Sequence, residues 1–174
     1  WALITPPPFS DAFLDHLAYP AHWLQDETIH RIPNYFHDRS TPYYPGNAWL
    51  LYLWVLAPFS AETLTNLTQF AALAFICFIV YTSAARSGGD RFSATAAAAA
   101  CMCFPFIFIF ALGSEIDMLF TLFFLLAAYW AWRARTGPHY APALFLGWCA
   151  LALMCGTKDL GIVYSIPLVP FLIP

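Results

Sequence analysis

Charged residues are scarce in this sequence. Of its 174 residues only 10% are charged, whereas ordinary soluble domains have about 25%. A water-soluble fold of this length has no way to bury the 61% of residues that are hydrophobic. Nucleic-acid binding is excluded as well, because no cluster of basic side chains could neutralise a phosphate backbone. We therefore expect an all-α polytopic membrane protein, with lipid as its solvent.

Familiar catalytic motifs are also absent. The sequence contains no P-loop, no nucleophile elbow and no HExxH zinc helix. Its five cysteines lie in apolar stretches without CxxC spacing, so we expect them to be small buried hydrophobes. The start of the sequence shows no signal-peptide pattern. The chain begins at Trp1 and ends at Pro174 within an apolar run, so we expect a piece of a longer protein. Any chemistry must come from carboxylates and a lysine.

Polar residues are concentrated in residues 1–45, which hold five of the ten acidic residues and four of the five histidines. Phe13, Leu14 and Leu17 recur at helical spacing and predict a short amphipathic helix along the membrane surface. Trp23 is the expected interface anchor. Because Pro20 interrupts the backbone hydrogen bonds, we expect two short helical pieces. Residues 1–45 are therefore predicted to form an external loop with interfacial helices.

The rest of the chain is apolar. Residues 46–59 contain a helical stretch of about ten residues, roughly 15 Å long, which is too short to cross a hydrocarbon core of about 30 Å. We expect it either to enter the membrane and return or to lie beside the membrane as a juxtamembrane helix. Residues 60–174 are predicted to form a transmembrane bundle of four or five spans. The expected helices are 60–85, 92–112, 116–134, 139–155 and 160–174.

Arginines in the short connections predict the orientation. Arg86 and Arg91 share one connection, and Arg133 and Arg135 share another that lies two spans later. Both connections are therefore on one face, which is cytoplasmic by the positive-inside rule. The remaining polar segments then lie together on the external face. They carry the residues Asp11, Asp15, Glu115, Asp117 and Lys158.

Each candidate has a purely structural alternative. Asp11 and Asp15 share one helix face, where their repulsion raises the pKa of one of them unless a cation or a hydroxyl group compensates the charge. The alternative is that they form a solvated polar face. Asp117 and Glu115 begin an apolar helix, where the helix dipole alone favours carboxylates. Lys158 suits a phosphate, but it could also extend toward water or pair with the neighbouring Asp159.

Four short motifs occur in order along the chain. They are Asp11-Ala-Phe-Leu-Asp15-His16-Leu17, Tyr43-Tyr44-Pro45-Gly46-Asn47, Ser114-Glu115-Ile116-Asp117 and the helix from Gly147 that ends in Gly156-Thr157-Lys158. In these residues the chain resembles bacterial membrane glycosyltransferases of the GT-C superfamily. These bacterial glycosyltransferases are related to the dolichyl-phosphate-mannose protein mannosyltransferases and the lipid A aminoarabinose transferases.

The resemblance implies a GT-C-like bundle in the bacterial inner membrane, with its active site on the external face. It would transfer a sugar, with inversion, from a polyprenyl-phosphate-linked donor to a lipid, glycan or protein acceptor. Asp11 would be the general base, although Asp15 stands where the family often has Tyr, so both remain candidates. Asp117 would assist or hold a divalent cation, which is the only cofactor considered, and Lys158 would meet the donor phosphate. The other implied substrate-binding residues are His16, Glu115, Tyr44 and Asn47.

A transporter or flippase of lipid-linked saccharides is the main alternative. Such a protein needs charged or broken helices near the bilayer midplane, whereas the charges of this sequence are expected at one external surface. A scaffold protein would need none of these charges.

Overall fold

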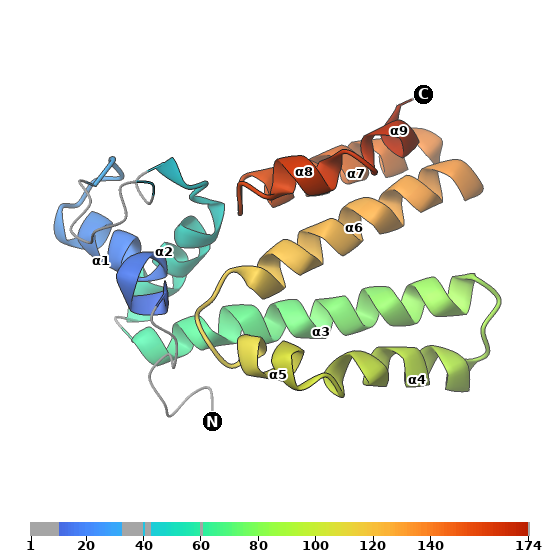
Figure 1. The fold of residues 1–174 in the computed structure, drawn as a ribbon, viewed down its shortest axis with the longest axis horizontal. Helices are drawn as coiled ribbons and strands as arrows, with labels where there is room; N and C mark the ends of the chain where they lie inside the picture. The colour runs from blue at the N-terminus through green and yellow to red at the C-terminus, as the bar shows by residue number, and fades with distance from the viewer. Residues whose placement is uncertain (1–10, 33–39, 41–42, 60, 174) are drawn as a thin grey trace.

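The computed structural model describes residues 11–32, 40, 43–59 and 61–173. All regular secondary structure in these ranges is helical, so the fold is all-α (Figure 1). A π-helical turn η1 (Ala12–His16) leads into α1 (Ala18–Gln25). The remaining helices are α2 (Asn47–Phe59), α3 (Glu62–Arg86), α4 (Arg91–Met102), α5 (Pro105–Ala111), α6 (Asp117–Thr136), α7 (Tyr140–Cys155), α8 (Gly161–Ser165) and α9 (Val169–Leu172).

The two pieces predicted for the first loop are present, but the chain does not divide at Pro20. Pro20 lies in the first turn of α1, where a missing N–H leaves no intrahelical hydrogen bond unmade. The division is at Leu17, whose N–H donates to the Ala12 carbonyl over 2.8 Å and closes the wide turn of η1. Tyr19 then stacks on Trp49 of α2, with ring centroids 4.3 Å apart. This contact fixes η1 and α1 against α2.

The predicted helix over residues 92–112 is wrong as a single helix. It consists of α4 and α5, which are bent by 70° relative to each other. Pro105 begins α5 and forces the preceding residue, Phe104, into extended backbone with ψ of 114°. The expected helix over 160–174 is likewise wrong as one helix, because α8 and α9 are separated in a segment that contains Pro167 and Pro170.

Arg135 of α6 stabilises this proline-rich end of the chain. Its guanidinium donates to the backbone carbonyls of Pro170, Phe171 and Ile173 at 3.0, 3.3 and 2.7 Å. These bonds tie the segment around α9 to the end of α6.

The long helices α3, α4, α6 and α7 run side by side (Figure 1). The first three elements, η1, α1 and α2, lie together at one end of them. Among the described residues, one helix, Leu64–Arg86, is long and apolar enough to cross a membrane, and the bent pair α4–α5 adds a second if it counts as one span. The helix α2 has 13 residues, about 20 Å at the helical rise, and is shorter than the hydrocarbon core.

Candidate active site

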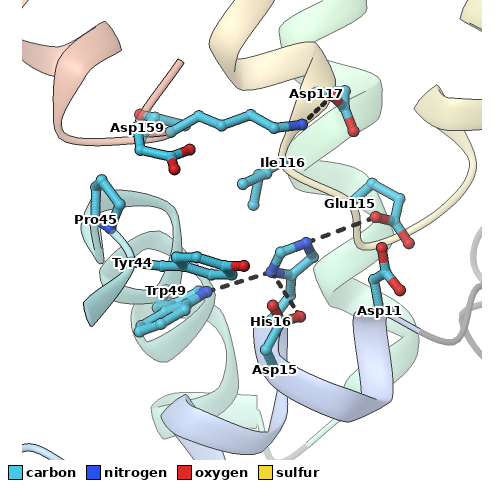
Figure 2. Close-up of a pocket in the computed structure, with 12 residues that line it drawn as sticks. Asp11, Asp15, His16, Tyr44, Pro45, Trp49, Glu115, Ile116, Asp117 and Asp159 are labelled. Carbon is cyan, nitrogen blue, oxygen red and sulfur yellow. Dashed lines mark hydrogen bonds and ion pairs between the residues drawn. The ribbon is translucent and has the colours of Figure 1, made fainter. Parts of the chain in front are cut away.

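One pocket lies where four segments meet: η1, the start of α2, the start of α6 and the end of α7 (Figure 2). Its volume is about 180 Å³. Seven of the eight residues singled out in the sequence line it, and the eighth, Asn47, does not. The lining residues include Asp11, Asp15, His16, Tyr44, Glu115, Asp117 and Lys158.

Asn47 has a different place. Its backbone N–H donates to the Gly156 carbonyl over 2.9 Å, and its side chain packs so closely on Gly156 that a Cβ at that position would overlap it. Thr157 follows, fully buried, with its hydroxyl donating to the Leu153 carbonyl over 2.7 Å. These contacts hold the turn that presents Lys158 to the pocket.

Lys158 pairs with Asp117 across 41 residues of sequence. Its Nζ lies 2.8 Å from Asp117 Oδ1, and both side chains are about a third exposed. Asp159, the nearest carboxylate in sequence, instead accepts a hydrogen bond from the Leu160 N–H over 3.0 Å. Asp117 also lies in the first turn of α6, so its dipole-favoured position and its pairing with Lys158 occur together.

His16 is at the centre of the acidic part of the pocket (Figure 2). The Trp49 indole donates to Nδ1 over 3.3 Å, and because an indole N–H only donates, this geometry makes Nδ1 an acceptor. The Nε2 atom faces Glu115 Oε2 at 3.6 Å. His16 is 6% exposed, and the sequence offers no ligand-like spacing that would have predicted this central position.

Two carboxylate oxygens in the pocket are buried without a hydrogen-bond donor among the described residues. They are Asp15 Oδ1 and Glu115 Oε1. Asp15 Oδ1 lies 3.1 Å from His16 Nδ1, but that nitrogen already accepts from Trp49. Burial raises the pKa of the Asp15 carboxyl, and the negative charges of Asp11 and Glu115 raise it further, while His16 partly offsets them. Unpaired buried oxygens of this kind favour a ligand that donates hydrogen bonds.

A buried polar network holds the chain that carries Glu115 and Asp117. The Tyr52 hydroxyl donates to the Glu115 carbonyl and accepts from Gln69 Nε2 over 2.7 Å. Gln69 Oε1 accepts from the Met118 N–H over 3.1 Å. Gln69 and Tyr52 are completely buried, so these bonds are shielded from water and fix the entry of α6.

A second part of the same network lies one residue earlier. The Ser114 hydroxyl donates to Asn66 Oδ1 over 2.8 Å and also bonds to the Thr65 hydroxyl. Thr65, Asn66 and Gln69 come from the first half of helix α3, whose middle is apolar. Polar side chains in the first half of a long apolar helix were the sequence signal for this network, and they were not used to predict it.

Around Asp117, the residues that the structure describes form no preassembled set of ligands for the expected divalent cation. Within the described residues no group of three His, Cys, Asp or Glu side chains has a metal-holding arrangement. Asp117, the residue considered as a ligand, has Lys158 against its carboxylate instead.

No protein-family model, curated protein or solved structure matches this chain. The GT-C resemblance accordingly depends on the four short motifs alone. The functional interpretation must come from the chemistry of the pocket.

Proposed function

We propose that this chain belongs to an integral membrane glycosyltransferase of GT-C type, which moves a sugar from a polyprenyl-phosphate-linked donor to an acceptor hydroxyl on the external face. One observation carries the proposal. Three segments far apart in sequence place carboxylates, His16 and Lys158 around one pocket, and two of its buried carboxylate oxygens lack a donor. An acceptor hydroxyl would supply the missing donor.

Asp15 is the better candidate for the general base. Its side chain is 14% exposed, its pKa is raised by burial, and its Oδ1 has no hydrogen-bond donor among the described residues. Asp11 is exposed. A base with a raised pKa takes a proton more effectively in the transition state. We assign Asp11 to the electrostatic surroundings of Asp15, in place of the base role that the resemblance gives it.

The proposed step is a single displacement. The acceptor oxygen attacks the anomeric carbon, its proton passes to Asp15, and the bond between that carbon and the phosphate oxygen breaks. The departing polyprenyl phosphate keeps the electron pair, and its charge is stabilised by Lys158. Attack from the side opposite to the leaving group inverts the anomeric centre.

The surface of the described chain supports a membrane setting. Several large apolar side chains are exposed, among them Phe75, Phe92 and Phe106 at 60%, 81% and 74%, and soluble monomers rarely leave so much apolar surface in water. The helix α3 and the bent pair α4–α5 supply the lengths needed for spans. The proposal therefore includes a multi-pass arrangement with α2 re-entrant.

The break between α4 and α5 is the one observation that favours a transporter or flippase, since such proteins use broken helices. In those proteins the break exposes charged or ion-binding groups. The residues at this break are Cys103 and Phe104, which carry no charge, and neither lines the acidic pocket. We therefore place the transporter second.

The test is sugar transfer by the full-length protein in vesicles supplied with a polyprenyl-phosphate sugar. Asp15→Asn should lower turnover by about 10² to 10⁴ while donor binding persists. Asp26→Asn is the matched control, because Asp26 is an exposed carboxylate of the same loop and does not line the pocket. Equal activity of both variants and the unaltered protein would remove the general-base role, and absence of transfer by the unaltered protein would remove the transferase proposal.

A further inference from the structure

A second cleft lies between α3 and α6, away from the acidic pocket. The two helices pack through Leu73, Ile76 and Leu119 and diverge toward the ends that carry Arg86 and Arg133 (Figure 1). In the diverging part they enclose a cavity of about 520 Å³. Its walls are mostly apolar and aromatic and include Phe75, Phe78, Ile79, Leu122, Leu126 and Trp130.

The cleft continues into a basic end. A neighbouring cavity of about 260 Å³ shares Arg86, Tyr129 and Trp130 with it and adds Arg133 and His139. Apolar walls therefore lead directly to two guanidinium groups.

These guanidinium groups have no protein partner in the described part of the chain. Neither Arg86 nor Arg133 is within ion-pair distance of a carboxylate there, and neither side chain makes a hydrogen bond. Arg135 differs, because backbone carbonyls already accept from it. Arginine forks bind phosphate oxygens with two parallel hydrogen bonds, so the open end of the cleft is suited to a phosphate group.

The length of the cleft agrees with a lipid chain. From Phe75 to Arg86 the helix rises roughly 17 Å, close to half of the hydrocarbon core of about 30 Å, which is one leaflet. Phe75 and Phe78 are 60% and 63% exposed and face the space that a chain would fill. A helix of a partner protein could cover the aromatic walls, but it would leave both guanidinium groups uncompensated unless it also carried acids.

We infer that the cleft binds one anionic phospholipid of the leaflet opposite the acidic pocket. Its phosphate lies between Arg86 and Arg133, and an acyl chain runs along Phe78 and Leu126. The inference depends on the membrane setting of the proposed function, and it is independent of sugar transfer. Basic pockets between spanning helices are a known form of anionic-lipid recognition.

The experiment uses the full-length protein in phosphatidylcholine vesicles and compares the association of spin-labelled phosphatidylglycerol with that of spin-labelled phosphatidylcholine. We expect the unaltered protein to prefer phosphatidylglycerol. Arg86→Gln and Arg133→Gln should each lower this preference about fivefold, which is the share of one basic residue near an anionic surface. Arg91→Gln is the charge-matched control, since Arg91 lies on the same connection as Arg86 but does not line the cleft.

A second variant tests the apolar walls separately. Leu126→Trp adds bulk inside the cleft and leaves both arginines in place, so it should release both labelled lipids from the site. An equal loss of preference in Arg91→Gln would mean diffuse surface charge and would overturn the inference. If the unaltered protein is integrated in the membrane but shows no preference for phosphatidylglycerol, the lipid-binding role of the cleft is refuted and the membrane setting is not. Extraction of the protein by alkaline carbonate would refute the membrane setting itself.

Discussion

Gly156 is a position beside Lys158 where a single added methyl group should disturb the pocket. An alanine Cβ at Gly156 would lie 2.8 Å from Asn47 Cγ and closer still to Nδ2. Carbon atoms in contact are normally about 3.5 to 4.0 Å apart. Gly156→Ala must therefore push the turn that carries Lys158 away from α2, or turn the Asn47 side chain out of its place.

The size of the effect follows from this overlap. Overpacking of this kind costs about 1 to 3 kcal/mol of stability, and a displacement of about 1 Å in an active site costs about 10²-fold in rate. We expect turnover of Gly156→Ala to fall by that factor. Asn47→Ala should have little effect alone, because the Asn47 backbone N–H still donates to the Gly156 carbonyl. The double variant should regain most of the activity, since the overlapping side chain is gone.

Turnover with a polyprenyl-phosphate sugar and the thermal midpoint in detergent are measured for all three variants. Gly46→Ala is a nearby control, because its Cβ would meet Trp49 at an ordinary 3.4 Å. A double variant as inactive as Gly156→Ala would refute the steric reasoning. Inactive Asn47→Ala with normal stability would instead return Asn47 to substrate binding, the role that the sequence resemblance gives it.

Three further predictions concern the pocket and its support. Lys158→Met keeps the side-chain length and deletes the charge, so donor binding and turnover should both fall; normal transfer would remove Lys158 from the site. The pKa of Asp15 is raised in the folded state from its ordinary value of 3.8. The stability that the protonated carboxyl contributes is therefore fully present below pH 3.8 and is lost as the pH rises through the raised pKa. Asp15→Asn should accordingly raise the thermal midpoint more at pH 7 than at pH 4, and an equal shift at both would contradict the burial argument. Gln69→Leu should leave the Tyr52 hydroxyl and Met118 N–H short of partners, at about 1 to 3 kcal/mol each, and should lower the thermal midpoint; an unchanged midpoint would show that the network does not hold the start of α6.

Parts of this structure follow from local rules, which is why they were predictable. The helices α3, α6 and α7 are predictable from the length of their apolar runs. The turn between α5 and α6 is predictable from the polar residues near Ser114. Charge placement alone suggested that Asp15 and Lys158 lie on one face, and both line one pocket. Those expectations require only the spacing of residues along the chain and the solvent preference of each type.

Other features depend on which side chains meet, and sequence spacing does not encode that. Trp49 reaches His16 across 33 residues because an aromatic stack holds α1 on α2. Lys158 pairs with Asp117 and not with the adjacent Asp159, whose carboxylate accepts from the Leu160 N–H. The bend before Pro105 is predictable from the proline, which disfavours helical backbone at the preceding residue. The length of the apolar run favoured the wrong expectation of one helix over 92–112.

The Lys158–Asp117 ion pair has a consequence for which anions can enter the pocket. Five carboxylates line it among the described residues, namely Asp11, Asp15, Glu115, Asp117 and Asp159, and the one lysine there is already neutralised. Free phosphate and nucleotides arriving from water should therefore be repelled. Under the proposed function, a donor anchored in the bilayer would diffuse in two dimensions and stay near the pocket, and its high local concentration would drive the exchange of Asp117 for phosphate on Lys158. Attachment of the donor to a lipid would in this way select it over soluble phosphates and nucleotides.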